Sequence, residues 1–292
     1  MKDYVNQNSF YNELVMLLEA GRRIIVAEGD VDYEILKKHI HDDARIVMGV
    51  GGREHVLKAA DAIHDQGYID ALFLVDKDFD GVIKSPRDFN GNVIPSKCHD
   101  FIMDLIDGSP ALIVAILDQI LSRARRSPKN GIRDELTATT LIDKAMDYAF
   151  IMSAVRIHSL DNARRWKLSE SILTTFGRRT GSVRQVVERV LQKSKQDTSS
   201  ENVDTIVGCV EKIYSSWSDD RSMLVGDHDF FDALSAVCRS EGVLVSPDDL
   251  SDRVVGAVRC DVMFNVFWYS EIEKWCRVRG WKGLACPRCR TA

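Results

Sequence analysis

One stretch of the chain constrains its fold more than any other, an apolar run that ends in three alternating carboxylates. Residues 69–75 read Ile-Asp-Ala-Leu-Phe-Leu-Val, and Asp76, Asp78 and Asp80 follow. The run predicts a buried strand, and open α/β sheets place their sites at the carboxyl ends of strands. Clustered carboxylates repel one another unless a cation neutralises them, and oxygen ligands favour magnesium, manganese or calcium. The stretch therefore predicts an acidic metal site.

The flanking sequence predicts an α/β domain with parallel strands. Apolar runs predict strands at 23–27, 44–47, 69–75 and 92–97, and helical periodicity predicts helices at 9–20, 30–40, 53–66 and 99–106. This alternation is typical of parallel strands joined by right-handed crossovers. Further along, the pattern predicts helices at 111–126, 136–158, 169–176 and 182–195, a flexible connection at 196–202, and mostly helix through 269. We expect an α/β domain over 1–108, with helices flanking its sheet, and a mainly helical domain over 109–292.

A second acidic cluster follows the first predicted strand. Glu28 and Gly29 stand directly after it, and Asp32 lies three residues further on. Parallel strands end at one edge of a sheet, so Glu28 and the aspartates after residue 75 can converge although about 50 residues separate them. Each cluster alone is also explained by helix capping or by a solvated turn. Both together, in this order, favour a metal site.

The two clusters resemble the motifs of the Toprim domain, which type II topoisomerases, bacterial primases and OLD-type nucleases share. Glu28 and Gly29 fit its glutamate motif, Asp32 fits the trailing acid, and Asp76 and Asp78 fit its Asp-x-Asp motif. The resemblance covers about residues 20–107. It implies that Asp76, Asp78 and Asp80 hold Mg²⁺, with Mn²⁺ as an alternative. It also implies that Glu28 acts in general acid/base catalysis or as a further metal ligand.

Other segments are similar to the stand-alone Toprim proteins of phage-defence operons, the AriB-type effectors of the PARIS system. These segments are Gly51-Gly52-Arg53, the Asp76–Asp80 run, His99-Asp100, residues 149–156 and Gly226-Asp227-His228-Asp229. The likeness implies a metal-dependent endonuclease that acts as a toxic effector. Such a protein is a homodimer when active and is restrained by a partner ABC-type ATPase. RNA, including tRNA, and DNA are both open as the substrate.

The chain departs from these relatives at one position. They often carry a glutamate shortly after the His-Asp pair, where this chain has Ile102 and Met103, followed by Asp104. This leaves Asp32, Asp100 and Asp104 as candidates for an additional acid. The chain contains no Walker loop, so ATP hydrolysis would have to come from the partner.

Composition excludes several classes of protein. The net charge of −5 indicates no overall basic surface, so nucleic-acid contacts would come from local patches. We expect such contacts at Arg53, Lys77, Arg125, Arg126, Arg164 and Arg165, although basic clusters are equally typical of solvated helix faces. No apolar run reaches the ~20 residues of a membrane span, and residues 1–8 lack the features of a signal peptide. Seven scattered cysteines fit a reducing cytosol, so we expect a cytoplasmic protein with no membrane contact.

Several alternatives stay open. Asp76–Gly81 begins like an EF-hand loop, but its twelfth position is Arg87 and a strand precedes it. A haloacid-dehalogenase-like phosphatase would use Asp76 as its nucleophile, although that motif normally follows the first strand. A catalytically silent Toprim-fold binding module is the remaining possibility. Three weaker patterns remain. The glycine-rich loop at 49–52 could bind a phosphate, and His99 and His228 are interpreted as structural residues. Cys276, Cys286 and Cys289 could form a zinc site, which needs a fourth ligand.

Overall fold

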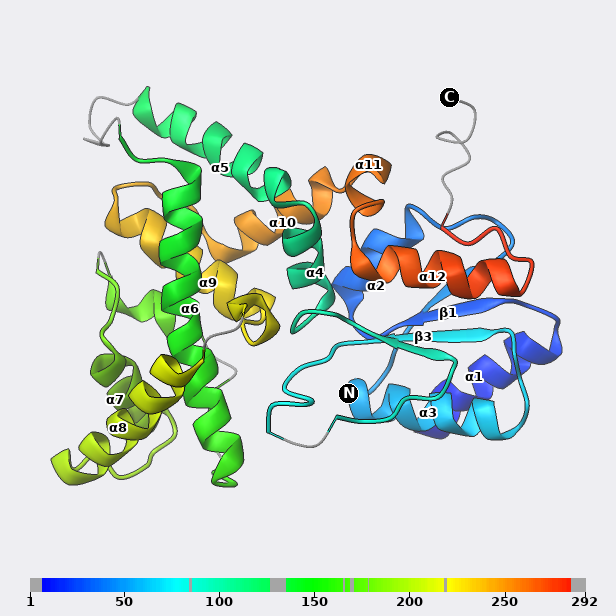
Figure 1. Ribbon diagram of the computed structural model, residues 1–292, viewed down its shortest axis with the longest axis horizontal. Helices are drawn as coiled ribbons and strands as arrows, with labels where there is room; N and C mark the ends of the chain where they lie inside the picture. The colour runs from blue at the N-terminus through cyan, green and yellow to red at the C-terminus, as the bar shows by residue number, and fades with distance from the viewer. Residues whose placement is uncertain are drawn as a thin grey trace. The chain divides into compact units, whose positions relative to one another are not determined.

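The computed structural model describes residues 7–83, 86–126, 135–164, 166–168, 171–177, 179–217 and 220–284 (Figure 1). These residues form two compact units. The first unit contains the described residues up to 78, those of 86–109 and those from 258 onward. The second contains residues 79–83 and the described part of 110–257.

The first unit is built on a parallel sheet of four strands. Its strands are β1 (Ile24–Ala27), β2 (Arg45–Met48), β3 (Ala71–Val75) and β4 (Val93–Pro95), in the order β2-β1-β3-β4. All residues of β1 and β3 are buried, as expected of central parallel strands that are covered on both faces. The predicted α/β class and all four predicted strands are confirmed.

Helices cover both faces of this sheet. They are α1 (Gln7–Glu19), α2 (Asp30–Lys37), α3 (Arg53–Asp65), α4 (Phe101–Gly108), α11 (Cys260–Met263) and α12 (Phe267–Val278). Figure 1 shows α1 and α3 on one face, with α2 and α12 on the other. Phe10 and Leu14 of α1 and Val56 of α3 are buried in one apolar cluster with Val26 and Phe73 of the sheet.

The C-terminal segment 258–284 belongs to the first unit, whereas the expected division placed all of 109–292 in a helical domain. The reason is long-range aromatic packing. The ring of Trp268 is buried with its centroid 5.5 Å from that of Phe101 in α4. The indole of Trp275 donates to the Gly91 carbonyl at 3.0 Å. Amphipathic periodicity predicts these helices but not the element on which they pack.

The second unit is helical over its described residues. It contains α5 (Pro110–Arg125), α6 (Ala138–Asp161), η1 (Leu173–Phe176), α7 (Val183–Lys193), α8 (Ser200–Ser216), η2 (Arg221–Met223), α9 (Asp227–Ser240) and α10 (Pro247–Ala257). Helix α6 is buried along most of its length and packs against α9. The helix predicted at 169–176 is only the short 3₁₀ turn η1, and the predicted flexible connection at 196–202 includes the start of α8.

No helix within the described ranges combines the length and the apolarity needed to cross a membrane.

Candidate metal and catalytic site

The candidate site lies where the strand order of the sheet reverses. From β1 the chain moves to β2 on one side and then to β3 on the other side of β1. In open α/β sheets, ligands bind in the crevice outside the carboxyl ends of the strands at such a switch point. Glu28 follows β1 directly and Asp76 follows β3 directly. The sheet topology therefore brings the two acidic clusters to the position where a ligand site is expected.

A hydrogen bond joins the two clusters. The Asp76 backbone amide donates to Oε2 of Glu28 at 3.0 Å, and the Glu28 amide donates to the Leu74 carbonyl at 3.2 Å. Burial raises the pKa of Glu28 to about 7; the Asp76 amide lowers that pKa in part, and the charge of Asp78 raises it. A carboxyl group with this pKa exchanges its proton near neutral pH, which is the property required of a general acid or base.

Asp76 is the most crowded carboxylate of the site. Its Oδ1 accepts a hydrogen bond from the Phe101 amide, 3.2 Å away, at the start of α4. Burial is the largest cause that raises the pKa of Asp76 well above its ordinary value, followed by the charges of Asp32, Asp100 and Glu28. These carboxylates are therefore close enough to repel one another.

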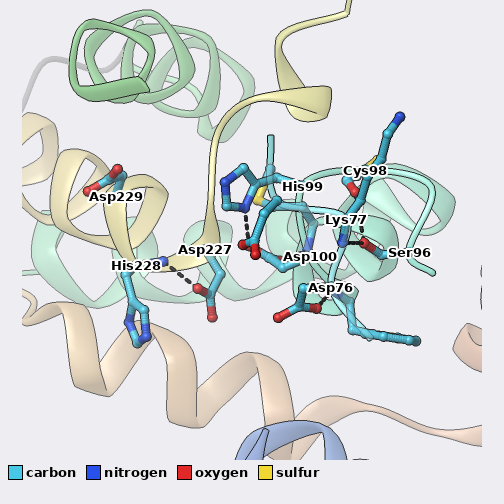
Figure 2. A network of polar contacts seen from close by, with 12 residues as sticks. Asp76, Lys77, Ser96, Cys98, His99, Asp100, Asp227, His228 and Asp229 are labelled. Atoms are coloured by element: carbon cyan, nitrogen blue, oxygen red, sulfur yellow. Dashed lines mark hydrogen bonds and ion pairs between the residues drawn. The ribbon is translucent and has the colours of Figure 1, made fainter. Parts of the chain in front are cut away.

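Two of the neighbouring acids begin helices. Asp100 is the N-cap of α4, and its Oδ1 accepts from the Met103 amide at 2.8 Å. Nδ1 of His99 lies 3.4 Å from Oδ2 of Asp100 (Figure 2). Asp32 is a buried residue in the first turn of α2. Helix capping thus accounts for one oxygen of Asp100, and its other oxygen faces the imidazole of His99.

Asp78 and Arg53 connect two loops at this edge. Asp78 has a positive φ of 50°, and its amide donates to the His99 carbonyl at 2.9 Å. Nε of Arg53 donates to the Asp76 carbonyl at 2.7 Å and lies 3.7 Å from Oδ2 of Asp78. Gly51 and Gly52, with φ of 83° and 76°, precede Arg53. The glycine-rich loop therefore aims the Arg53 guanidinium at the aspartate loop.

A serine that the sequence motifs did not single out fixes the same loop. The Lys77 amide donates to Oγ of Ser96 at 2.8 Å, and this hydroxyl donates to the Cys98 carbonyl at 2.8 Å (Figure 2). Ser96 directly follows β4, which is the one local signal that could have indicated it. The backbone after β3 is therefore tied to the backbone after β4.

Asp104 has a structural role instead of joining the site as an extra acid. It is almost fully buried. Its two oxygens accept from the backbone amides of Lys97 at 3.0 Å and Cys98 at 2.6 Å. Burial raises its pKa, and these two bonds lower it in part. From its spacing in the sequence, Asp104 was a candidate to replace the glutamate of the relatives. In the structure its carboxylate holds the loop after β4.

The remaining predicted residues are distributed over the second unit. Asp80 lies in residues 79–83, where the amides of Val82 and Ile83 donate to the Phe79 carbonyl. Nη2 of Arg125 donates to the Leu136 carbonyl at 2.6 Å, and Arg126 and Arg164 are exposed. His228 is also exposed, and its amide donates to Asp227 at the start of α9 (Figure 2). Arg165, Cys286 and Cys289 lie outside the described residues.

The chemistry of the donor set suits a hard divalent cation, because all its side-chain ligands would be carboxylate oxygens. A cation would also relieve the repulsion that raises the pKa of Asp76. Within the described parts of the chain, however, no three His, Cys, Asp or Glu side chains are arranged so that they could hold a metal ion. The carboxylates are gathered at one edge, and they would have to reorient to coordinate a metal.

Comparisons of the chain with protein-family models, with curated proteins and with solved structures found no match in any of the three.

Proposed function

We propose that this protein is a metal-dependent endonuclease of the Toprim type that cleaves phosphodiester bonds in nucleic acid. The observation that carries the proposal is the contact between Glu28 and the Asp76 amide across the β1–β3 switch point. A carboxyl group with a pKa of about 7 thus lies beside a cluster of aspartates. In this proposal Glu28 is the proton acceptor and the aspartates are the metal ligands at the same edge of the sheet.

In this proposal each residue at the edge has a distinct task. Asp76 and Asp78 would hold Mg²⁺ or Mn²⁺, and the bound cation would supply positive charge against the charge that develops on the phosphate. Glu28 accepts the proton of the attacking water or hydroxyl group. Arg53 keeps the aspartate loop in place through the Asp76 carbonyl. Asp32 and Asp100 add negative charge near Asp76, which strengthens the attraction for a divalent cation.

The biological setting that we propose comes from the sequence resemblance. The protein would act in the cytoplasm as a toxic effector of anti-phage defence, similar to the AriB-type effectors. It would form a homodimer when active and would be restrained by a partner ABC-type ATPase. The motifs that support this setting are Gly51-Gly52-Arg53 and His99-Asp100.

A catalytically silent binding module is the second candidate. It is favoured by the absence of a preassembled three-ligand group among the described residues and by the structural use of Asp104. A phosphatase of the haloacid-dehalogenase type is less well supported. Its nucleophile, Asp76, would follow β3, the third strand along the chain, whereas that motif normally follows the first strand.

The test is a cleavage assay on purified protein with labelled tRNA, total RNA and duplex DNA, each with Mg²⁺, Mn²⁺ or EDTA. The Glu28→Ala variant removes the proposed base. Glu34→Ala is the matched control, because Glu34 is an exposed residue on the neighbouring helix α2. We expect cleavage that needs metal, persists in Glu34→Ala and falls by about 10²-fold or more in Glu28→Ala.

Cleavage by Glu28→Ala at the wild-type rate would contradict the proposal. If neither protein cleaves any substrate, co-expression with the partner ATPase and a toxicity assay separate the two candidates. Toxicity that survives Glu28→Ala would favour the binding module.

A further inference from the structure

The second unit carries a group of cations around the C-terminal end of α7. The Lys167 amide donates to Oγ of Ser194 at 2.7 Å, and Ser194 is the C-cap of α7. This bond brings the loop after α6 alongside the end of α7. We name the cations gathered there the α7 basic surface, consisting of Arg164, Lys167, Arg189, Lys193 and Lys195.

Most of this positive charge is not balanced by carboxylates. Over the described parts of the chain, Arg164, Lys167, Arg189 and Lys195 form no ion pair with an acidic side chain. Five other basic side chains of this unit do have an acidic partner, in the pairs Arg184–Asp204, Arg221–Asp147, Arg156–Asp229, Lys144–Glu241 and Arg253–Asp249. The whole chain is acidic. A local excess of unpaired cations on such a chain is typical of a binding site for a polyanion.

The acidic residues nearest in the sequence do not cancel this excess. Asp197 follows Lys195 by two positions, and its carboxylate keeps its negative charge while it accepts hydrogen bonds from the amide and the hydroxyl of Ser199 at 2.9 and 2.8 Å. Asp161 is exposed at the end of α6 and is a single charge. Glu188 precedes Arg189 on α7, and its carboxylate lies 3.7 Å from Arg184. Arg164, Lys167, Arg189 and Lys195 together carry one more charge than Asp161, Glu188 and Asp197, so a small positive excess is left.

Arg164 is held in place by the fold. The Arg164 guanidinium lies over the ring of the buried Trp166, 5.3 Å from its centroid. The backbone of Arg164 is fixed at both ends, because its amide donates to the Ser159 carbonyl at 2.8 Å and its carbonyl accepts from the Ser159 hydroxyl at 2.9 Å. Nε of Arg189 is buried without a hydrogen-bond partner among the described residues. Less side-chain entropy is lost when ordered cations of this kind bind a ligand.

A structural explanation covers only part of the cluster. Cations near a helix C-terminus stabilise the helix by interacting with its dipole, which accounts for Lys193 in the last turn of α7. Arg164 and Lys167 belong to a different segment, and Arg189 lies one turn earlier on the same face as Lys193. The helix dipole therefore does not explain why these residues gather there.

We propose that the α7 basic surface binds the phosphate backbone of the nucleic acid on which the protein acts. The inference rests on the proposed nuclease function and adds residues of the second unit to those that contact the substrate. Arginine guanidinium groups suit this role because their planar donors match phosphate oxygens, and lysines add point charge. The contacts are to the backbone, so the surface contributes affinity and orientation more than sequence preference.

The experiment measures binding without cleavage. Fluorescein-labelled tRNA, single-stranded RNA and duplex DNA are titrated by fluorescence anisotropy with Glu28→Gln protein in EDTA, at several KCl concentrations. The test variant adds Lys167→Gln and Lys195→Gln to this background. The control adds Lys144→Gln and Arg184→Gln, which remove the same charge from ion-paired cations of the same unit. Circular dichroism checks that every variant is folded.

We expect the test variant to bind at least one of these nucleic acids about tenfold more weakly at ~0.1 M salt. We also expect the slope of log affinity against log salt to fall by about 1.5, because each lost phosphate contact removes roughly 0.7–0.9. The control should bind like the parent. Equal losses in test and control variants would overturn the inference, and so would the absence of binding to any nucleic acid.

A polyglutamate competitor distinguishes an acidic protein partner. If the surface binds polyglutamate but no nucleic acid, the assignment to nucleic acid is wrong. The two proposals can also fail separately. Binding that depends on the α7 basic surface, together with toxicity that survives Glu28→Ala and no cleavage, would leave the inference standing and remove the nuclease. Cleavage that depends on Glu28, with equal binding by the parent and the test variant, would support the nuclease and overturn the inference about the α7 basic surface.

Discussion

Replacing Glu28 by glutamine should stabilise the metal-free protein, by an amount that grows as the pH rises from about 4.5 to about 7. Glutamine keeps an oxygen that can accept the hydrogen bond from the Asp76 amide but cannot ionise. In the folded protein the pKa of Glu28 rises from its ordinary value of 4.5 to about 7. The unfolded chain therefore loses this proton at lower pH than the folded chain does. The contribution of Glu28 to stability is greatest below pH 4.5 and is lost as the pH rises toward 7.

The size of the effect follows from the shift in pKa. The difference between 4.5 and about 7 corresponds to roughly 3 kcal/mol in the free energy of unfolding. Glu28 is only partly buried, so solvent screening reduces the expected gain of Glu28→Gln to about 1–3 kcal/mol at pH 8. At pH 4 the gain should be close to zero.

Urea unfolding in EDTA at pH 4 and pH 8 measures this difference. Hydrogen exchange of the β1 and β3 amides shows whether this difference in stability arises in the first unit. The reasoning would be refuted by a Glu28→Gln protein that is no more stable than the wild type at pH 8, or by a gain of the same size at both pH values. In saturating Mg²⁺ the wild type should be more stable than Glu28→Gln, because a bound cation stabilises the ionised glutamate.

Three further substitutions test how the edge of the sheet is held. Asp104→Ala leaves the buried Cys98 amide and the partly buried Lys97 amide without an acceptor and should cost about 1–3 kcal/mol in the free energy of unfolding, measured in urea. Gly51→Ala places a Cβ against the His55 ring at a residue with positive φ, so it should lower the thermal midpoint of unfolding. Gly67 has a similar φ but open space around the added Cβ, so Gly67→Ala should lower the midpoint less. Arg53→Ala should reduce the cleavage rate more than substrate affinity, and Arg53→Lys, which can still reach the Asp76 carbonyl, should restore part of that rate.

Local sequence patterns were sufficient for the framework of the first unit. The buried run before Asp76 and the β-branched run before Glu28 predicted central parallel strands, and they form β3 and β1. A parallel sheet that ends at one edge follows from the alternation of strands and helices. The proximity of Glu28 and Asp76 could therefore be expected from the sequence, because it depends only on strand adjacency and direction.

Contacts between distant segments could not be predicted in the same way. The packing of Trp268 on Phe101 depends on the complementary shapes of two helices far apart in the sequence. Similarly, the spacing around Asp104 is compatible with a metal ligand and with a buried acceptor, and only its contacts with Lys97 and Cys98 decide between them. Arg53 was expected to contact nucleic acid, and the sequence carries no indication that it also donates to the Asp76 carbonyl.

The central claim is that the carboxylates beyond β1 and β3 bind a divalent cation, and Mn²⁺ binding followed by electron paramagnetic resonance tests it most directly. The measurement uses metal-free wild-type protein, Asp76→Asn as the test variant and Asp118→Asn, an exposed residue of α5, as the control. We predict saturable Mn²⁺ binding that Mg²⁺ displaces, that Asp118→Asn retains and that Asp76→Asn loses. Undetectable binding to the wild type, or binding that Asp76→Asn leaves unchanged, would contradict the claim.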